Sequence, residues 1–256
     1  MMSAKPKLRT VSGLPPLSYK AKKAGTLSNY RIYGNTVSGE SVGDRTGNLF
    51  DAEIVQGSFN SNTGAIRDAT NRIRSNESDF IYLTKGTYTI NADGVDDVVR
   101  YAYSSEDTST FLYYHSITSW QSLPHTFTVQ TPCYFLFGFR FSDDSDIIPS
   151  DISNIMLNSG STALPYEPYG YRVPVTVTNG TDTQTTNIYL PEPLTKSGDN
   201  ADYIDYATQK RHNSDGTESS VTLPEISTFA GTNTLSVGTT VQPSAMEVTG
   251  RIKSAE

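Results

Sequence analysis

The stretch "CYFLFGFRF", Cys133–Phe141, decides the fold class that we expect for this chain. Its phenylalanines recur at every second position, and successive side chains of a β-strand point to opposite faces of a sheet. One face of this segment therefore carries Phe135, Phe137, Phe139 and Phe141, and we expect that face to lie in the core. The pattern predicts a strand of a β-sandwich.

Short extended runs of the same kind follow one another from Thr46 onward, separated by clusters of Gly, Asn, Asp and Ser. This spacing is typical of an all-β sandwich or barrel. We expect eight strands, the number that a jelly roll requires, in residues 53–59, 65–75, 80–90, 97–104, 110–117, 125–131, 133–141 and 151–157. The fold class that we predict is all-β, with a jelly-roll β-sandwich.

Two prolines divide the chain near its middle. In "NIMLNSGSTALPYEPYGY", Asn154–Tyr171, a strand-like run ends in small polar residues and a Pro-Tyr-x-Pro-Tyr segment. Pro165 and Pro168 fix their own φ and bias the preceding residue toward extended backbone, which is typical of a rigid exit from a domain. We therefore expect three parts: an extended N-terminal arm in 1–45, the sandwich in 46–170 and a smaller C-terminal β domain in 171–256.

Charge is unevenly distributed along the chain. The first 39 residues hold seven Lys or Arg and no acid, which leaves 13 basic against 27 acidic residues in the remainder. A basic arm before an acidic body could dock on a neighbouring subunit or remain a solvated terminus. Nucleic acid is a poor partner, because the acidic body would repel phosphate.

The composition excludes several classes of protein. No apolar stretch approaches the ~18 residues that span a bilayer, and the N-terminus has no unbroken apolar core, so we expect no membrane insertion and no signal peptide. The single cysteine, Cys133, excludes disulfides within the chain and lies in an apolar run where burial is its commonest fate.

Motifs that carry catalysis are absent or lack their context. "GESVG", Gly39–Gly43, matches a nucleophile elbow in letters, but no buried strand precedes it and no helix follows it. Zinc spacings, phosphate-binding glycine loops and dinucleotide fingerprints are missing. We expect no enzyme activity, although a pair of distant carboxylates, as glycosidases use, stays open as an alternative.

A cluster of acids after the phenylalanine strand is the candidate metal site. Asp143, Asp144 and Asp146 offer the oxygen ligands that calcium prefers, but they do not follow the EF-hand spacing. Solvated loop carboxylates are the alternative explanation, and we expect no other cofactor.

Aromatic residues give the candidate binding site. Flat rings beside polar loops suit the apolar faces of sugars. The expected carbohydrate platform consists of the only tryptophan and four tyrosines: Trp120, Tyr113, Tyr114, Tyr101 and Tyr103. The alternative is that some of these rings belong to the core and the others to a protein interface.

Three longer segments carry a resemblance to a known group of proteins. They are Tyr30–Asp51, Ile155–Tyr171 and Ile188–His212. In this order they closely resemble segments of minor tail and baseplate proteins of phages and prophages of Gram-positive bacteria. "IMLNSGSTALPYEP" also resembles the last strand of carbohydrate-binding jelly rolls.

This resemblance implies a structural component of a phage tail, made in the host cytoplasm and incorporated in the virion. It implies other tail or baseplate proteins and a host-surface polysaccharide as partners, and a homo-oligomer, with a homotrimer as the first expectation. The alternative function is a tail-associated glycan hydrolase or esterase. No catalytic residue is carried over from these proteins.

Overall fold

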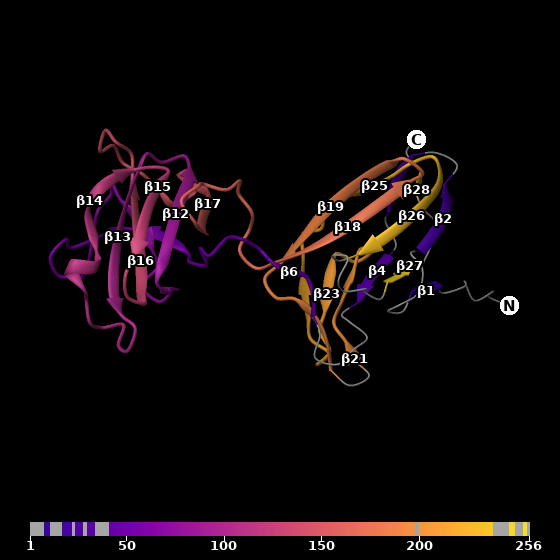
Figure 1. The fold of residues 1–256 in the computed structure, drawn as a ribbon, viewed down its shortest axis with the longest axis horizontal. Coiled ribbons are helices and arrows are strands. Elements are labelled where there is room, and N and C mark those ends of the chain that lie inside the picture. The colour runs from indigo at the N-terminus through magenta and orange to yellow at the C-terminus, as the bar shows by residue number, and fades with distance from the viewer. Residues whose placement is uncertain are drawn as a thin grey trace. The chain divides into compact units, whose positions relative to one another are not determined.

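The computed structural model describes residues 8–10, 17–21, 24–27, 30–33, 41–197, 200–237, 246–248 and 253–254. The chain divides into two compact units, drawn in Figure 1: Thr46–Tyr169 form one, and Met1–Arg45 together with Gly170–Glu256 form the other. Strands make up almost all regular structure of the described residues, and the only helical turns there are two 3₁₀ turns, η1 (Tyr113–His115) and η2 (Pro149–Asp151). The expected all-β class is confirmed.

Two antiparallel sheets form the unit Thr46–Tyr169. The larger has the order β14-β13-β16-β10-β7, with β11 also paired to β16, and the smaller has the order β15-β12-β17. The larger sheet comprises β7 (Ile54–Gln56), β10 (Ile73–Ser75), β11 (Ile81–Leu83), β13 (Asp97–Ser104), β14 (Ile117–Ser122) and β16 (Cys133–Arg140). The smaller comprises β12 (Gly86–Asp93), β15 (His125–Val129) and β17 (Ser153–Ser159). The chain crosses between the two sheets at β11–β12, β12–β13, β14–β15, β15–β16 and β16–β17, whereas β7, β10 and β11 follow one another in the larger sheet and β13 and β14 form a hairpin within it.

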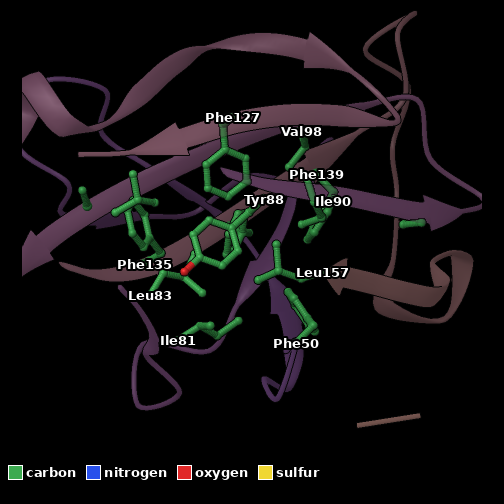
Figure 2. Close-up of a cluster of buried hydrophobic side chains, with 14 of the residues drawn as sticks. Phe50, Ile81, Leu83, Tyr88, Ile90, Val98, Phe127, Phe135, Phe139 and Leu157 are labelled. Carbon is green, nitrogen blue, oxygen red and sulfur yellow. The ribbon is translucent and has the colours of Figure 1, made fainter. Parts of the chain in front are cut away.

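The core lies between these two sheets. Phe135 and Phe139 of β16 face Tyr88, Phe127 and other residues of the smaller sheet (Figure 2). Phe135, Phe137 and Phe139 are fully buried, and Phe141 packs partly buried against the same cluster. The phenylalanine face that alternation predicts is therefore the core, and burial of its large apolar area is the main stabilising term of the sandwich.

A second apolar layer covers the outer face of the larger sheet. The short hairpin of β8 (Ser58–Phe59) and β9 (Ile66–Arg67) lies there, and Phe59 packs at a tilt against Tyr101 with ring centroids 4.7 Å apart. Val99, Tyr103 and Leu136 belong to the same buried cluster. β13 and β16 are buried on both faces, and β16 is apolar at nearly every position, whereas β13 also buries the charged residues Asp97 and Arg100.

Hydrogen bonds of one asparagine join the entry of the sandwich to its exit. The buried Asn48 side chain donates to the carbonyls of Ile155 and Glu167 at 2.9 and 2.8 Å and accepts from the amides of Phe50 and Leu157. Asn158 closes the turn that follows β17, donating to Thr162 O and accepting from Leu164 N. The two prolines of the exit therefore lead back to the start of the domain.

The second unit contains four small sheets in its described residues. A four-strand path β19-β18-β26-β2, with β6 beside β18, comprises β2 (Leu17–Ala21), β6 (Asp44–Arg45), β18 (Tyr171–Asn179), β19 (Asp182–Leu190) and β26 (Gly231–Val237). The path β1-β27-β4-β22-β23-β24 comprises β1 (Leu8–Thr10), β4 (Tyr30–Tyr33), β22 (Tyr203–Asp205), β23 (Lys210–His212), β24 (Glu218–Ser220) and β27 (Met246–Val248). The remaining two sheets are β25 (Ile226–Thr228), β3 (Gly25–Leu27) and β28 (Lys253–Ser254), and β21 (Asn200–Ala201), β20 (Leu194–Ser197) and β5 (Ser41–Val42).

The expected N-terminal arm in 1–45 and separate C-terminal domain in 171–256 need correction. Strands of the N-terminal segment pair with C-terminal strands, as β2 does with β26 and β4 with β22. Leu27 and Ile32 supply buried core side chains to this unit, and Arg31 forms an ion pair with Asp205 at 2.7 Å. The described part of the N-terminal segment therefore folds onto its own chain. Its apolar residues enter the core of this unit, and Arg31 finds an acidic partner within the same chain. Lys5, Lys7, Lys22 and Lys23 lie outside the described residues.

Some expected strands are shorter or differently formed. The run 65–75 is divided into β9 and β10, and the run 80–90 is divided between β11 and β12, which belong to different sheets. The expected strand 110–117 is wrong: Phe111 makes one isolated bridge to Tyr103, and Tyr113–His115 form the 3₁₀ turn η1. Aromatic content alone predicts a strand here. The tertiary contacts of this segment with β13 and the second apolar layer favour a turn instead.

We expect Asn48→Ala to destabilise the sandwich by about 2–4 kcal/mol, because it leaves buried backbone groups without partners. Urea unfolding followed by Trp120 fluorescence measures this, since the only tryptophan lies in this unit. Asn62→Ala, at an exposed side chain, is the control and should change the free energy of unfolding by less than about 0.5 kcal/mol. Equal stabilities of the two variants would contradict the role of Asn48.

Candidate functional site

The five aromatic residues of the expected carbohydrate platform do not form one exposed surface. Tyr101 and Tyr103 are 3% and 7% exposed within the second apolar layer. Burial raises the pKa of both phenols, that of Tyr103 to about 12, and the Tyr103 hydroxyl donates to Gly64 O at 2.9 Å. These two residues are structural, which corrects their assignment to a sugar site.

Trp120 lies on β14 and packs partly buried against the same layer. The guanidinium carbons of Arg72 and Arg140 lie 4.9 and 4.7 Å from its ring centroid. Both arginines also bind Asp144 Oδ1 at 2.7 Å, and Arg140 binds Asp97 at 2.9 Å. Cation–π contacts thus occupy the indole, which favours the structural alternative for this residue over a sugar platform.

Tyr113 and Tyr114 are the exposed members of the set, at 48% and 96%. Their rings meet edge to face, with centroids 5.6 Å apart, on the turn η1. Backbone contacts fix this turn: Leu112 N donates to Ala102 O, and Arg100 Nη1 donates to His115 O at 3.0 Å. These contacts hold the turn that carries the exposed pair in place.

The acids proposed as calcium ligands have separate partners. Asp144 pairs with the two arginines, Asp146 accepts from the Thr70 hydroxyl at 2.7 Å, and Asp143 accepts from Ser145 N at 3.0 Å. Within the described residues no group of three or more His, Cys, Asp or Glu side chains could hold a metal ion. The cluster therefore consists of loop carboxylates with local partners.

A different pair of tyrosines lines an open pocket of the sandwich. The pocket has a volume of about 390 Å³, within the range of small-ligand sites. Tyr166, which is 45% exposed, and Tyr169 come from the exit segment that Asn48 holds. Its apolar lining residues are Phe50, Ala52, Ile54, Pro149, Ile152 and Ile155.

The polar groups of this pocket are uncharged. Ser153, Asn154 and Asn48 line it, and no Asp, Glu, Lys, Arg or His of the described residues does. Asn48 is saturated by backbone groups, whereas the Asn154 amide donates to Asp93 Oδ2 at 2.8 Å. A lining of apolar residues, two tyrosines and neutral polar groups suits a neutral sugar, and it lacks the carboxylate pair that glycoside hydrolysis requires.

A buried cation lies elsewhere in the core. Arg100 is 8% exposed, its guanidinium lies 4.4 Å from the Phe127 ring centroid, and its Nε has no hydrogen-bond partner within the described part of the chain. Burial lowers the pKa of Arg100 to about 10. Burial and, second, the charge of Arg100 lower the pKa of His125, whose ring stacks on Phe127. The space beside these groups cannot hold a water molecule, so they form no open site.

The sequence interpretation missed Tyr166 and Tyr169 as site residues. It used the Pro-Tyr-x-Pro-Tyr segment only as a domain boundary. The available signal was that each tyrosine directly follows a proline, because such prolines limit the backbone freedom that binding would otherwise have to restrict.

Comparisons of the chain with protein-family models, with curated proteins and with solved structures found no match. None of the helical segments in the described residues has the length and apolar character needed to cross a membrane.

We expect Trp120→Ala to lower the stability of the sandwich by about 2–3 kcal/mol, less than the ~3–5 kcal/mol of a fully buried aromatic residue. Tyr114→Ala should change stability by less than about 0.5 kcal/mol, because its ring is almost wholly exposed. Unfolding followed by near-UV circular dichroism of the tyrosines compares the two. If Trp120→Ala were as stable as the wild type, the structural role of the indole would be contradicted and Trp120 would again be a candidate for sugar binding.

The lowered pKa of His125 predicts a pH dependence of stability. The unfolded state binds a proton near the ordinary histidine pKa of 6.5, and the folded state does so only at lower pH, so acidification below 6.5 favours unfolding. We expect His125→Phe to flatten the stability profile between about pH 6.5 and 5, above the range in which carboxylates titrate. Free energies of unfolding across this interval test it, and parallel profiles of variant and wild type would contradict it.

Proposed function

We propose that this chain is a non-catalytic structural component of a phage tail whose sandwich binds a neutral host-surface saccharide. The resemblance of its three longer segments to minor tail and baseplate proteins supports the tail assignment. The all-β architecture is compatible with this assignment, because the hydrogen bonds between paired strands stabilise a component of a virus particle.

The pocket that Tyr166 and Tyr169 help to line is the observation that carries the proposed binding function. It combines the size of a small-ligand site, two rings on a restrained segment and a lining without charge. The absence of acids from this lining favours binding over hydrolysis, since glycosidases place two carboxylates across their groove.

A single pocket of this kind binds weakly. Shallow sugar sites gain useful adhesion from many copies on one particle, because linked sites raise avidity about 10²-fold or more without new contacts. A tail component present in several copies, acting in the virion at the cell surface, meets this requirement.

Saccharide binding by the purified full-length chain tests the proposal. The probes are neutral oligosaccharides of hexose and N-acetylhexosamine and the purified cell-wall polysaccharide of a Gram-positive host, titrated by calorimetry and protein-detected NMR. We expect Tyr166→Ala to reduce affinity about tenfold, equivalent to about 1.4 kcal/mol.

Tyr82→Ala is the matched control for this experiment. Tyr82 is 49% exposed, close to the 45% of Tyr166, and lies in the same unit away from the pocket lining. It should bind as the wild type does. Absence of binding to every neutral probe, or equal losses in both variants, would overturn the proposed site.

A further inference from the structure

Strand β19 (Asp182–Leu190) has an unused edge. It is the terminal strand of the path β19-β18-β26-β2, and Figure 1 shows it along the border of that sheet. Its ladder with β18 runs without interruption from Tyr171↔Leu190 to Asn179↔Asp182. Among the described residues no strand pairs with its other side.

The geometry of the hairpin identifies the outward backbone groups. Gly180 and Thr181 form a two-residue loop, and such a loop closes on a hydrogen-bonded pair, here Asn179 and Asp182. Hydrogen-bonded and non-hydrogen-bonded pairs then alternate along an antiparallel ladder. The phase agrees with Pro174, which has no amide proton and lies opposite Asn187 in a non-hydrogen-bonded pair. The outward amides and carbonyls belong to Thr183, Thr185, Asn187 and Tyr189.

This edge lacks the features that normally prevent strands of different molecules from pairing. From Thr183 to Leu190 it contains no charged residue, no proline and no bulge. Edge strands of monomers are usually short, charged, bulged or covered. Other terminal strands of the described structure do have such features. β2 carries Lys20, β24 has only three residues and includes Glu218, and β14 pairs through a bulge. The Leu49 amide donates to Leu157 O of β17.

Contacts within its own unit also hold β19 in place. Ile188 and Leu190 are buried in the core of this unit. On the outer face, threonine hydroxyls join β19 to β18, with Thr176 and Thr185 3.0 Å apart and Thr178 and Thr183 3.3 Å apart. A second strand would therefore meet a rigid template, which lowers the entropy lost on pairing.

We infer that β19 pairs antiparallel with β19 of a second copy of this chain, centred on Thr186, and so joins two sheets into one. This register sets Thr183 opposite Tyr189 and Thr185 opposite Asn187, and it uses every outward backbone group. No like charges face each other within the neutral run, although the whole chain carries a formal charge of −7. The contact is isologous and closes at two copies, in place of the expected homotrimer.

This inference does not rest on saccharide binding. The two would cooperate, because a pair of copies presents two sandwich pockets. Loss of dimerisation with unchanged affinity for a monovalent sugar would separate the interface from the binding site.

Oligomeric state of the full-length chain, measured by sedimentation and by chromatography with light scattering, tests the inference. The wild type should form a dimer in the micromolar range. The double variant T185K/N187K places lysines opposite each other across the interface and should be monomeric. The control T232K/S236K adds the same charge at exposed positions of the central strand β26 and should remain a dimer.

Cysteine cross-linking tests the register. Thr186 lies opposite itself in a non-hydrogen-bonded pair, so T186C should form a disulfide-linked dimer under mild oxidation, whereas Q184C, opposite Ile188, should not. Far-UV circular dichroism confirms folding of every variant. A wild type that is monomeric or trimeric, a dimer of T185K/N187K, or equal cross-linking of T186C and Q184C would each overturn the pairing.

Discussion

The ladder between β13 and β16 is the constraint on which the sandwich depends. Every residue from Asp97 to Ser104 has a partner between Arg140 and Cys133, in unbroken register. Both strands are covered on both faces, by the smaller sheet on one side and by the β8–β9 hairpin with its aromatic neighbours on the other. A shift by one residue would exchange the two faces, moving Phe137 and Leu136 between differently shaped layers, so two cores specify a single register.

This double coverage explains how the polar and charged residues of the unit are arranged. Trp120 lies at the margin of the outer layer, where Arg72 and Arg140 cover its ring and Asp144 neutralises them. Arg100 lies on the same face of β13 as the core residues Val98 and Ala102 and so enters the core side, where ring faces and one carbonyl partly replace water. Burying a cation in this way costs stability. The hydrogen bond from Arg100 to His115 O fixes the turn η1.

Part of this architecture could be predicted from the sequence, because the underlying interactions are periodic. Alternating phenylalanines identified the core face of β16, and turn residues between short apolar runs identified an all-β sandwich. Alternation cannot tell whether the second face of a strand meets solvent or another layer, and Tyr101 and Tyr103 were misassigned for that reason. Pairing of N-terminal with C-terminal strands leaves no local signal either, since each strand is compatible with many partners. The pocket at Tyr166 depends on the hydrogen bonds by which Asn48 holds the exit segment. These bonds join residues far apart in the sequence, so local patterns do not predict them.

The connection between the two units suggests how assembly and recognition can be separated in one chain. Arg45 and Tyr171 are paired residues of β6 and β18, so the chain leaves the discontinuous unit and re-enters it at neighbouring positions. Gly170 has a φ of 124°, and a Cβ there would lie 2.2 Å from Leu190 O, so only glycine fits at the point of return. A domain whose ends lie close together can be inserted into another with little disturbance of either core. Changes at the pocket of the sandwich are therefore compatible with a constant β19 edge in the discontinuous unit, so the proposed saccharide site and the proposed self-association can vary independently.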